Sequence, residues 1–320
     1  MKYRALGNSG LQVSEIGFGA WGIGGLVQDS SAYGPTDDKV SQQALAAAFD
    51  AGVTFYDTAA LYGYGHSEEL LGKTFRTVRD QIVLSTKAGY VNFSGVQDFS
   101  PGFLRTSLEA SLRRLQTEYV DVFQLHDPPI DLLKNDNTIM AALETLQNEG
   151  KIRVIGISTR SPMDSLTAVE QLGFKSIQVN FNMVDQRAIE VGLFDACRTH
   201  GVGIIARTPL CFGFLTGKYA ADDDYAEGDH RRKWKREQIE LWADAYKLFR
   251  AELGNEVLQT NAQIALRYVL SFAEVSTTIP GMLTEDHVSE NVTASGLGPF
   301  SPSLLADFAG IYGQHSFFAK

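Results

Sequence analysis

Residues 37–58 read DDKVSQQALAAAFDAGVTFYDT, a segment of helical periodicity that leads directly into a short apolar run. In Asp37–Ala51 the apolar side chains recur at three- and four-residue intervals, the spacing of one buried helix face. Asp37 or Asp38 is suited to cap the start of this helix, and Gly52 is suited to end it. Val53–Thr58 then has the composition of a parallel strand that is covered on both faces. The segment therefore predicts one helix followed by one buried strand.

The same alternation of apolar runs and helical segments extends along the whole chain. The apolar runs are Ile16–Ala20, Val53–Thr58, Ile82–Thr86, Val120–Leu125, Arg153–Ser158, Ile177–Phe181, Gly203–Ala206 and Val275–Ile279. The helical segments are Asp37–Ala51, Glu68–Phe75, Pro101–Leu115, Ile139–Asn148, Pro162–Leu172, Ala188–His200, Asn261–Phe272 and Asp286–Thr293. Eight such strand–helix pairs are typical of a (β/α)8 TIM barrel, the α/β fold that we predict. A doubly wound open sheet should show a Gly-x-Gly-x-x-Gly turn after its first strand, whereas residues 21–25 read WGIGG.

Three segments lie outside this repeat. Tyr3–Leu6 and Leu11–Ser14 flank a Gly-Asn-Ser-Gly turn and predict a hairpin that plugs the closed end of the barrel. The polar stretch Ala221–Glu237 is too long for a plain connector and predicts a functional loop. Lys235–Leu253 and Ser301–Gly313 predict extra helices towards the C-terminus. We expect residues 1–320 to form one domain.

Composition excludes several classes of protein. The 28 Lys and Arg against 38 Asp and Glu give a net charge of −10, which argues against nucleic-acid and anionic-membrane partners. Two cysteines, Cys197 and Cys211, are too few for a disulfide framework and have no metal-ligand spacing. The six histidines form no His-Glu-x-x-His cluster, so we expect no metal. No signal-peptide pattern and no apolar run of about 18 residues occurs. We expect a cytoplasmic enzyme or binding protein.

Charged side chains lie where three consecutive predicted strands end. Asp57 ends the second run, Lys87 ends the third and His126 ends the fourth. Tyr62 follows Asp57 by five residues, in a Gly-rich loop. Because the working face of a barrel is built at the carboxyl ends of its strands, we expect these four side chains to share one rim.

This set of groups is suited to carbonyl reduction. We expect the Lys87 ammonium to favour the phenolate and so lower the pKa of Tyr62 from about 10. Asp57 would keep Lys87 charged, and Tyr62 would then protonate an oxygen that gains negative charge. His126 could hydrogen-bond the same oxygen. A separate hydride donor is required.

Each of these residues also has a structural interpretation. Asp57 could cap a helix, Lys87 could lie on the surface, and His126 could be a turn residue. Tyr62 could be a packing residue, and Trp21, directly after the first strand, could either pack or line a substrate pocket. Their joint occurrence on adjacent strands favours a functional interpretation.

These residues belong to a wider pattern, by which the chain resembles the aldo-keto reductase superfamily over essentially its full length. Residues 52–59, GVTFYDTA, continuing through Tyr62-Gly63 to Leu71-Gly72, look like the family's first signature. Ser85–Lys87 and Gln124–His126 match the segments that carry its other catalytic positions. The resemblance implies a catalytic tetrad of Asp57, Tyr62, Lys87 and His126.

The resemblance also implies a nicotinamide cofactor bound without a Rossmann domain, usually NADP as NADPH. NAD stays open, because Gly281 and His287 stand where several members have a Lys and an Arg that contact the 2′-phosphate. Thr159 stands where the family has an Asn, and Arg207 where many members have an aromatic residue. The cofactor contacts implied by the resemblance are Ser158, Thr159, Gln178, Arg207, Pro209, Leu210, Gly213, Leu215, Gly217, Lys218, Gly281, Thr284, His287, Glu290 and Asn291.

The sequence thus favours an NAD(P)H-dependent oxidoreductase that acts on aldehyde, ketone or sugar-like carbonyls, or on the corresponding alcohols. Two alternatives stay open. The chain could be a cofactor-sensing binding subunit without catalysis, as in some relatives that act as channel partners. It could also be a lyase that uses Lys87 as a Schiff-base former. The sequence indicates no oligomeric state.

Overall fold

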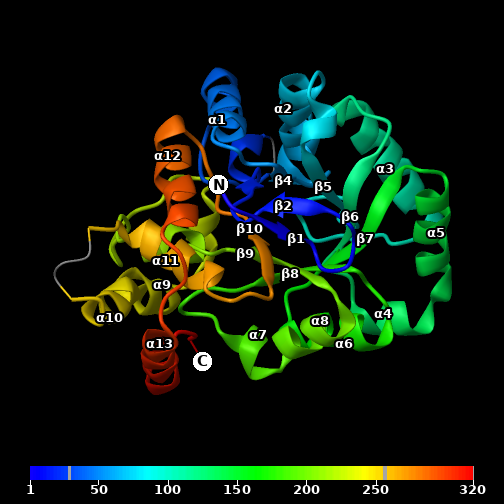
Figure 1. Cartoon of the computed structure of the whole chain (residues 1–320). Helices are drawn as coiled ribbons and strands as arrows, with labels where there is room; N and C mark the ends of the chain where they lie inside the picture. Colours follow the sequence, from blue (N-terminus) through cyan, green and yellow to red (C-terminus); the bar gives the residue numbers. More distant parts are fainter. Residues whose placement is uncertain (28–29, 255–257, 320) are drawn as a thin grey trace.

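Eight parallel strands form one curved sheet with helices on its outer side (Figure 1). The computed structural model describes residues 1–27, 30–254 and 258–319. The strands are β3 (Phe18–Gly19), β4 (Phe55–Asp57), β5 (Val83–Ala88), β6 (Val120–His126), β7 (Ile152–Ser158), β8 (Ser176–Asn180), β9 (Gly203–Arg207) and β10 (Val275–Thr278). They pair in chain order from β3 to β10. Gly17 N donates to Thr278 O at 2.8 Å and Gly19 N to Pro280 O at 3.0 Å, so the first and last strands meet. The predicted (β/α)8 barrel is confirmed.

The helices alternate with the strands as the sequence periodicity predicts. They are α1 (Asp38–Asp50), α2 (His66–Phe75), α3 (Pro101–Leu115), α4 (Ile130–Asn135), α5 (Asn137–Asn148), α6 (Pro162–Gln171), α7 (Arg187–Glu190), α8 (Leu193–His200), α9 (Arg236–Ala243), α10 (Ala245–Ala251), α11 (Asn261–Leu270), α12 (Glu285–Thr293) and α13 (Pro302–Gln314). Asp37 caps α1, since its side chain accepts a hydrogen bond from Val40 N.

Two expected helices are each divided in the structure. The helix expected over Ala188–His200 is α7 followed by α8, because Gly192 between them takes a left-handed conformation at φ 75°. The helix expected over Lys235–Leu253 is α9 followed by α10, with Asp244 leaving the helical region at φ −106° and ψ 1°. In both cases the apolar periodicity continues through the break, so periodicity alone did not reveal it.

A two-stranded hairpin closes one end of the barrel. It consists of β1 (Tyr3–Ala5) and β2 (Gln12–Ser14), which pair antiparallel. Leu6, Leu11 and Val13 of the hairpin segment join one buried apolar cluster with residues of six barrel strands or their ends. The members from the barrel are Phe55, Val83, Val122, Val154, Ile205 and Ile279. This cluster fills the inside of the barrel, so the predicted plug is confirmed and the amino end of the barrel is closed (Figure 1).

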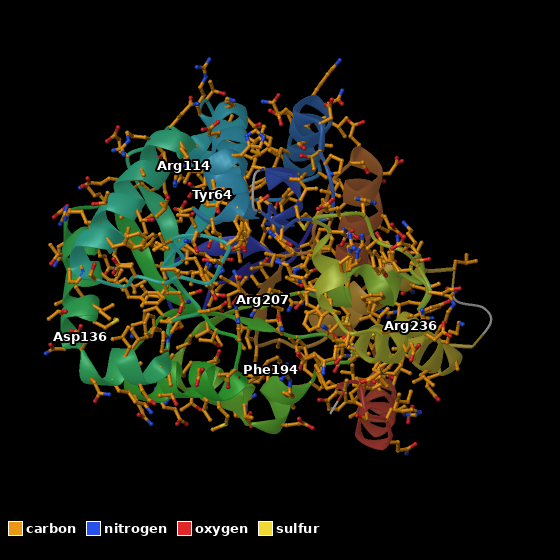
Figure 2. All side chains as sticks on the ribbon, turned by 180° about the vertical axis from the view of Figure 1, so that it is seen from behind. Tyr64, Arg114, Asp136, Phe194, Arg207 and Arg236 are labelled. Atoms are coloured by element: carbon orange, nitrogen blue, oxygen red, sulfur yellow. The ribbon has the colours of Figure 1, made fainter. Side chains whose placement is uncertain are left out.

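The opposite end of the barrel collects the carboxyl ends of the strands. Figure 2, which views the molecule from behind, shows Arg207 of β9 near the centre of the ring of elements. Long loops follow β3, β5 and β9 at this end, and they contain short 3-10 turns such as η4 (Cys211–Thr216) and η5 (His230–Lys233). The fold therefore leaves one open face, onto which the strand ends deliver their side chains.

Candidate active site

Three adjacent strands deliver the predicted acid, base and imidazole to the open face. Asp57 is the last residue of β4, Lys87 is near the end of β5, and His126 is the last residue of β6. The strands pair in register, with Asp57 opposite Ser85 and Lys87 opposite Gln124. Tyr62 begins the 3-10 turn η2 (Tyr62–Gly65) after β4. The structure thus brings together all four residues.

Asp57 and Lys87 form a buried ion pair. Lys87 Nζ donates to Asp57 Oδ2 at 2.5 Å and to the backbone oxygen of Thr58 at 2.8 Å. Lys87 is 1% exposed and Asp57 is 2% exposed. Burial lowers the pKa of Lys87, but the Asp57 carboxylate and the Tyr62 side chain outweigh burial and raise it on balance. Lys87 is therefore held as an ammonium ion.

The other oxygen of Asp57 is held by neutral donors. Oδ1 accepts hydrogen bonds from Ser85 Oγ at 3.0 Å, from Gln124 Nε2 at 3.2 Å and from Gln178 Nε2 at 2.8 Å. Because three donors meet Oδ1 and the Lys87 ammonium meets Oδ2, the carboxylate is fixed in position by protein groups. Gln178, a predicted cofactor contact, therefore bonds Asp57 through its amide nitrogen and keeps its amide oxygen for another partner.

Tyr62 receives the third hydrogen bond of the lysine. Lys87 Nζ lies 3.3 Å from Tyr62 Oη and 4.9 Å from the centre of its ring. Burial raises the pKa of Tyr62, and the Lys87 charge opposes this shift without reversing it. Our expectation that Lys87 lowers this pKa below its ordinary value is wrong, because the sequence shows the cation but not the depth of burial. Tyr62 is protonated at neutral pH.

His126 is a neutral imidazole in this environment. Burial lowers its pKa to about 3, and the positive charges of Lys87 and Arg207 act in the same direction. Its ring meets the Tyr62 ring edge-on at a centroid distance of 6.1 Å and the Tyr90 ring at 4.9 Å. A neutral imidazole between two phenols can hydrogen-bond a carbonyl oxygen without adding charge to the site.

One cavity of about 870 Å³ opens at the carboxyl ends of the strands. Lys87 is not among its lining residues and contacts Tyr62, which is. Asp57, Tyr62 and His126 line the cavity. Trp21 also lines it, and its ring lies 6.4 Å from the Tyr62 ring, 4.9 Å from Tyr33 and 4.8 Å from His230, as centroid distances. Trp21 therefore both packs and forms the wall beside Tyr62, so the two interpretations from the sequence do not exclude each other.

Most of the predicted cofactor contacts line the same cavity. Those that line it are Gln178, Arg207, Pro209, Leu210, Gly213, Lys218, Gly281, His287, Glu290 and Asn291. The others, which the cavity lining does not include, are Ser158, Thr159, Leu215, Gly217 and Thr284. Thr159 Oγ1 lies 2.6 Å from Ser165 Oγ and donates to Ser161 O, so its hydroxyl is already bonded. Thr284 caps α12 through its side chain.

The lining residues fit an extended dinucleotide. Arg207 donates through Nη2 to Thr159 O at 3.0 Å, whereas its buried Nε has no hydrogen-bond partner among the described residues. Such an unpaired donor is unfavourable unless a ligand supplies an acceptor. At Gly281 an added Cβ would meet no atom within 4 Å, so the cavity is open there. A nicotinamide dinucleotide has acceptors along its whole length, which matches these features.

The end of the cavity beside α12 has little positive charge. Lys218 Nζ lies 3.5 Å from Glu290 Oε2, which partly offsets its charge. Burial and the nearby Lys218 lower the pKa of His287, so this imidazole is neutral at neutral pH. His287 Nδ1 accepts from Leu283 N at 3.3 Å. Lys218, which the resemblance assigns to the diphosphate loop, is therefore the main cation near this end.

Several residues of the site were not singled out from the sequence. Ser85 and Gln124 precede Lys87 and His126 by two positions, and strand side chains alternate in direction. That period of two was a usable signal for finding them.

A second group of residues that received no role from the sequence lies just beyond strand ends. Tyr90, Asp127 and Arg160 line the cavity. Arg160 Nη2 donates to Tyr90 Oη at 2.7 Å, and Tyr90 Oη donates to Asp127 Oδ2 at 3.2 Å. Phe318, near the C-terminus, also lines the cavity, and no local sequence pattern indicated it.

The described part of the chain shows neither a metal-ligand cluster nor a helix that could span a membrane. In residues 1–27, 30–254 and 258–319 no group of His, Cys, Asp and Glu is arranged to hold a metal ion. Over the same residues, no helix combines the length and apolar character needed to cross a membrane.

Comparison with known proteins gives consistent matches along the chain. Residues 15–312 match the model of the aldo/keto reductase family. The chain is 32% identical over 307 residues to aldo-keto reductase yakc [NADP(+)] of Schizosaccharomyces pombe, which covers 91% of this chain and 86% of that protein. It is 33% identical over 330 residues to L-glyceraldehyde 3-phosphate reductase of Escherichia coli K12, covering 96% and 91%.

Solved structures agree with these sequence matches. The holo form of aldo-keto reductase AKR11C1 from Bacillus halodurans superposes with a TM-score of 0.78 at 29% identity, covering 97% of this chain and 96% of that one. Glycerol dehydrogenase AKR11B4 from Gluconobacter oxydans superposes with a TM-score of 0.80 at 26% identity, covering 99% and 97%. Both likenesses extend over the barrel and its loops.

Proposed function

The chain belongs to the aldo/keto reductase family and is an NAD(P)-dependent oxidoreductase, and on this premise we propose that Tyr62 is its general acid and base. In the direction of reduction, Tyr62 hands its proton to a carbonyl oxygen while the carbonyl carbon receives hydride. In the opposite direction, the tyrosinate takes the proton of an alcohol. The observation that carries the proposal is the contact of 3.3 Å between Lys87 Nζ and the hydroxyl of Tyr62, a residue that lines the cavity.

The protonation states support reduction at neutral pH. Burial keeps the pKa of Tyr62 above its ordinary value, so the hydroxyl carries a proton to give. Once the proton has left, the ammonium of Lys87 stabilises the phenolate, and Asp57 holds that ammonium in place. Neutral His126 orients the carbonyl oxygen towards Tyr62 by a hydrogen bond.

The same geometry disfavours a Schiff-base mechanism. All three hydrogens of the Lys87 ammonium have partners, namely Asp57, Thr58 O and Tyr62. A Schiff base forms from a neutral amine, and the pKa of Lys87 is raised rather than lowered. The non-catalytic alternative has less support, because the tetrad is complete and its members Asp57, Tyr62 and His126 line an open cavity.

We propose NADPH as the preferred cofactor, with NADH accepted less well. When bound, the nicotinamide supplies hydride to the carbonyl carbon. The resemblance assigns Arg207 and Gln178 to its nicotinamide end, Gly213 and Lys218 to its diphosphate and His287 to its adenosine end, and all five residues line the cavity. The relative from Schizosaccharomyces pombe carries NADP(+) in its name, which supports this order.

We propose small aldehydes, ketones or sugar-like carbonyls as substrates. The wall around Tyr62 combines aromatic surface, from Trp21 and Tyr90, with the polar pair Asp127 and Arg160. Such a wall suits compact substrates that carry hydroxyl or anionic groups beside the carbonyl. The similarity to a protein named L-glyceraldehyde 3-phosphate reductase supports this substrate class.

A reducing compartment such as the cytoplasm is the location that we propose. Cys197 and Cys211 are both buried and free. Structural disulfides are usual in oxidising compartments and rare in the cytosol.

Replacement of Tyr62 by Phe tests the proposal. We expect turnover of an aldehyde panel to fall by about 10²–10⁴-fold, because the general acid is lost while the ring stays. The NADPH dissociation constant, measured by quenching of protein fluorescence, should stay within a factor of about two. Tyr64→Phe is the matched control, since Tyr64 lies in the same turn but is 44% exposed and packs on Phe93. A Tyr62→Phe enzyme with normal turnover would refute the proposal.

A further inference from the structure

Three polar residues that the proposed mechanism does not use lie just beyond the ends of neighbouring strands. Tyr90 follows β5, Asp127 directly follows β6 and Arg160 follows β7. These strands are adjacent in the sheet (Figure 1), and all three residues line the cavity. We call Tyr90, Asp127 and Arg160 the rim cluster.

Hydrogen bonds within the rim cluster fix the carboxylate of Asp127. Arg160 Nε donates to Asp127 Oδ2 at 3.1 Å, and Tyr90 Oη donates to the same oxygen at 3.2 Å. Arg160 Nη2 in turn donates to Tyr90 Oη at 2.7 Å. The backbone is held as well, because Asp127 N donates to Ser158 O at 2.8 Å and Gln97 Nε2 donates to Asp127 O at 2.9 Å. The position of the carboxylate is therefore set before any ligand binds.

The other oxygen of this carboxylate is left over. Oδ1 is buried and accepts no hydrogen bond from the described residues, since both bonds of the rim cluster go to Oδ2. An ionised carboxylate oxygen can only accept hydrogen bonds. A buried acceptor without a donor is unfavourable, and Asp127 forms part of the cavity wall. A ligand in the cavity that donates a hydrogen to Oδ1 would remove this cost.

The rim cluster borders the place where the carbonyl group of a substrate would lie. Asp127 directly follows His126, which we propose orients the carbonyl oxygen. The rings of Tyr90 and His126 meet edge-on, with 4.9 Å between their centroids. His126 therefore lies between the rim cluster and Tyr62, whose ring it meets at 6.1 Å. A substituent close to the carbonyl is the part of a substrate that can reach Asp127.

The charges around His126 restrict the chemistry of that substituent. Besides burial, the positive charges of Lys87, Arg207 and Arg160 lower the pKa of His126, and the negative charge of Asp127 opposes them. Three cations would repel an ammonium group on the substrate. A carboxylate or a fully ionised phosphate brings no hydrogen for Oδ1. A hydroxyl is neutral and carries a hydrogen to donate, so it satisfies both conditions.

We propose that Asp127 is a specificity-determining residue, which binds a hydroxyl group beside the substrate carbonyl through Oδ1, with Tyr90 and Arg160 as its positioning residues. This inference rests on the function proposed above and narrows the substrates to hydroxy-aldehydes and hydroxy-ketones. A substrate without the hydroxyl leaves Oδ1 unpaired, and a site with an unpaired buried group discriminates against such a substrate.

Pairs of substrates that differ only by hydroxyl against methyl test the proposal. The pairs are glycolaldehyde with propanal, hydroxyacetone with butanone, and 4-hydroxy-2-butanone with 2-pentanone. We expect the wild-type kcat/KM to favour the hydroxyl member of at least one pair by about 10- to 100-fold, the gain typical of a hydrogen bond to a charged group. In Asp127→Gly this preference should fall to within a factor of about two, because the acceptor is gone. Glycine suits the backbone of residue 127, which has a φ of 53°.

The ratio within a pair distinguishes recognition from a merely structural role. General damage to the site would lower kcat/KM for both members of a pair by the same factor and leave their ratio unchanged. Asp131→Asn is the matched control, since Asp131 also follows β6 but has a side chain that is 83% exposed and does not line the cavity. Its ratios should equal those of the wild type.

The outcomes separate this inference from the proposed function. A wild-type protein that reduces none of these compounds with NADPH or NADH would overturn the proposed function itself. A wild-type protein that reduces them without preferring the hydroxyl member of any pair would overturn only the role of Asp127. A hydroxyl preference that survives in Asp127→Gly would overturn that role too.

A second variant decides the matter if circular dichroism shows that Asp127→Gly does not fold. In Asp127→Asn the amide oxygen must face the donors of Tyr90 and Arg160, so an uncharged NH2 group replaces Oδ1. A fall in the hydroxyl preference of about threefold or more supports the proposal, because the charged acceptor is lost. An unchanged preference overturns it.

Discussion

Two buried aspartates, Asp57 and Asp121, each pair with cations but lie at opposite ends of the barrel. One ion pair lies at the open end, and the other lies at the closed end. Asp57 ends β4, and Asp121 lies at the beginning of β6. Asp121 is fully buried and accepts from Arg79 at 2.8 Å, from Arg153 at 2.7 Å and from Leu84 N at 2.9 Å. It ties the amino ends of β5, β6 and β7 together.

The two ion pairs differ in whether the cation has a hydrogen left to donate to a group that faces the cavity. Around Asp121, the arginines bond a carboxylate and backbone oxygens, such as those of Ile82 and Tyr119 for Arg79. Around Asp57, the single lysine keeps one hydrogen for Tyr62, which faces an open cavity. A buried ion pair at the closed end of the barrel therefore stabilises the fold, whereas one at the open end prepares a proton donor.

Among the changes that test this comparison of the two aspartates, loss of the Lys87 charge should give the largest effect on catalysis. We expect Lys87→Met to lower kcat by about 10²–10³-fold, because nothing then stabilises the Tyr62 phenolate. The variant should also unfold at lower urea concentration, since Asp57 becomes a buried unpaired carboxylate. Steady-state kinetics and urea denaturation measure the two effects.

The double variant Asp57→Asn/Lys87→Met separates these effects. It removes both buried charges, so the free energy of unfolding should recover towards the wild-type value while kcat stays low. Recovery of kcat together with stability would contradict the view that the pair acts on the chemistry.

Asp121→Asn should show the opposite pattern. We expect the free energy of unfolding to fall by about 1–3 kcal/mol, because the buried carboxylate charge that Arg79 and Arg153 share is lost. The kcat of the folded variant should stay within a factor of about two of wild type. A large loss of kcat at full stability would erase the distinction between the two aspartates.

Trp21→Ala tests the cavity wall at the open end of the barrel. Trp21 forms the wall beside Tyr62, so we expect KM for an aldehyde to rise about tenfold, equivalent to about 1.4 kcal/mol of lost contact. The NADPH dissociation constant and the free energy of unfolding should change little. An unchanged KM across the aldehyde panel would limit Trp21 to packing against Tyr33 and His230.

The smallest effect that we expect is that of pH. The pKa of Tyr62 is raised above its ordinary value of about 10, so the Tyr62 hydroxyl stays protonated as pH rises to about 9. The pKa of His126 is about 3, so the imidazole stays neutral down to about pH 5. The kcat for reduction should therefore be nearly constant from about pH 5 to about pH 9, and oxidation should gain rate as pH rises towards the Tyr62 pKa. An inflection near pH 6.5 in the kcat of reduction would show that His126 titrates in its ordinary range.

Much of the architecture was open to prediction because it depends on local patterns. The strand at residues 120–126 and the helix at 101–115 appear nearly as their periodicity indicates. The positions of Asp57, Lys87 and His126 followed from the same pattern, because parallel strands bring their carboxyl ends to one rim. Ser85 and Gln124 could have been found by the same alternation but were overlooked.

Other features depend on contacts between distant segments. Thr159 bonds its own loop and α6 instead of facing the cavity, and Phe318 reaches the cavity wall from the far end of the chain. Arg231 gains its rings from Tyr33 and Tyr219, nearly 200 residues apart. No local sequence pattern predicts such contacts between residues that lie far apart in the chain.

The amino-acid sequence alone determined the barrel, its hairpin plug and the four residues on its rim, since hydrophobic periodicity and strand polarity are local properties. Only the tertiary structure decided the pKa shift of Tyr62 and the tyrosine rings that surround Arg231. A pKa depends on how much solvent the surrounding fold removes, and the direction of a guanidinium depends on which rings close around it.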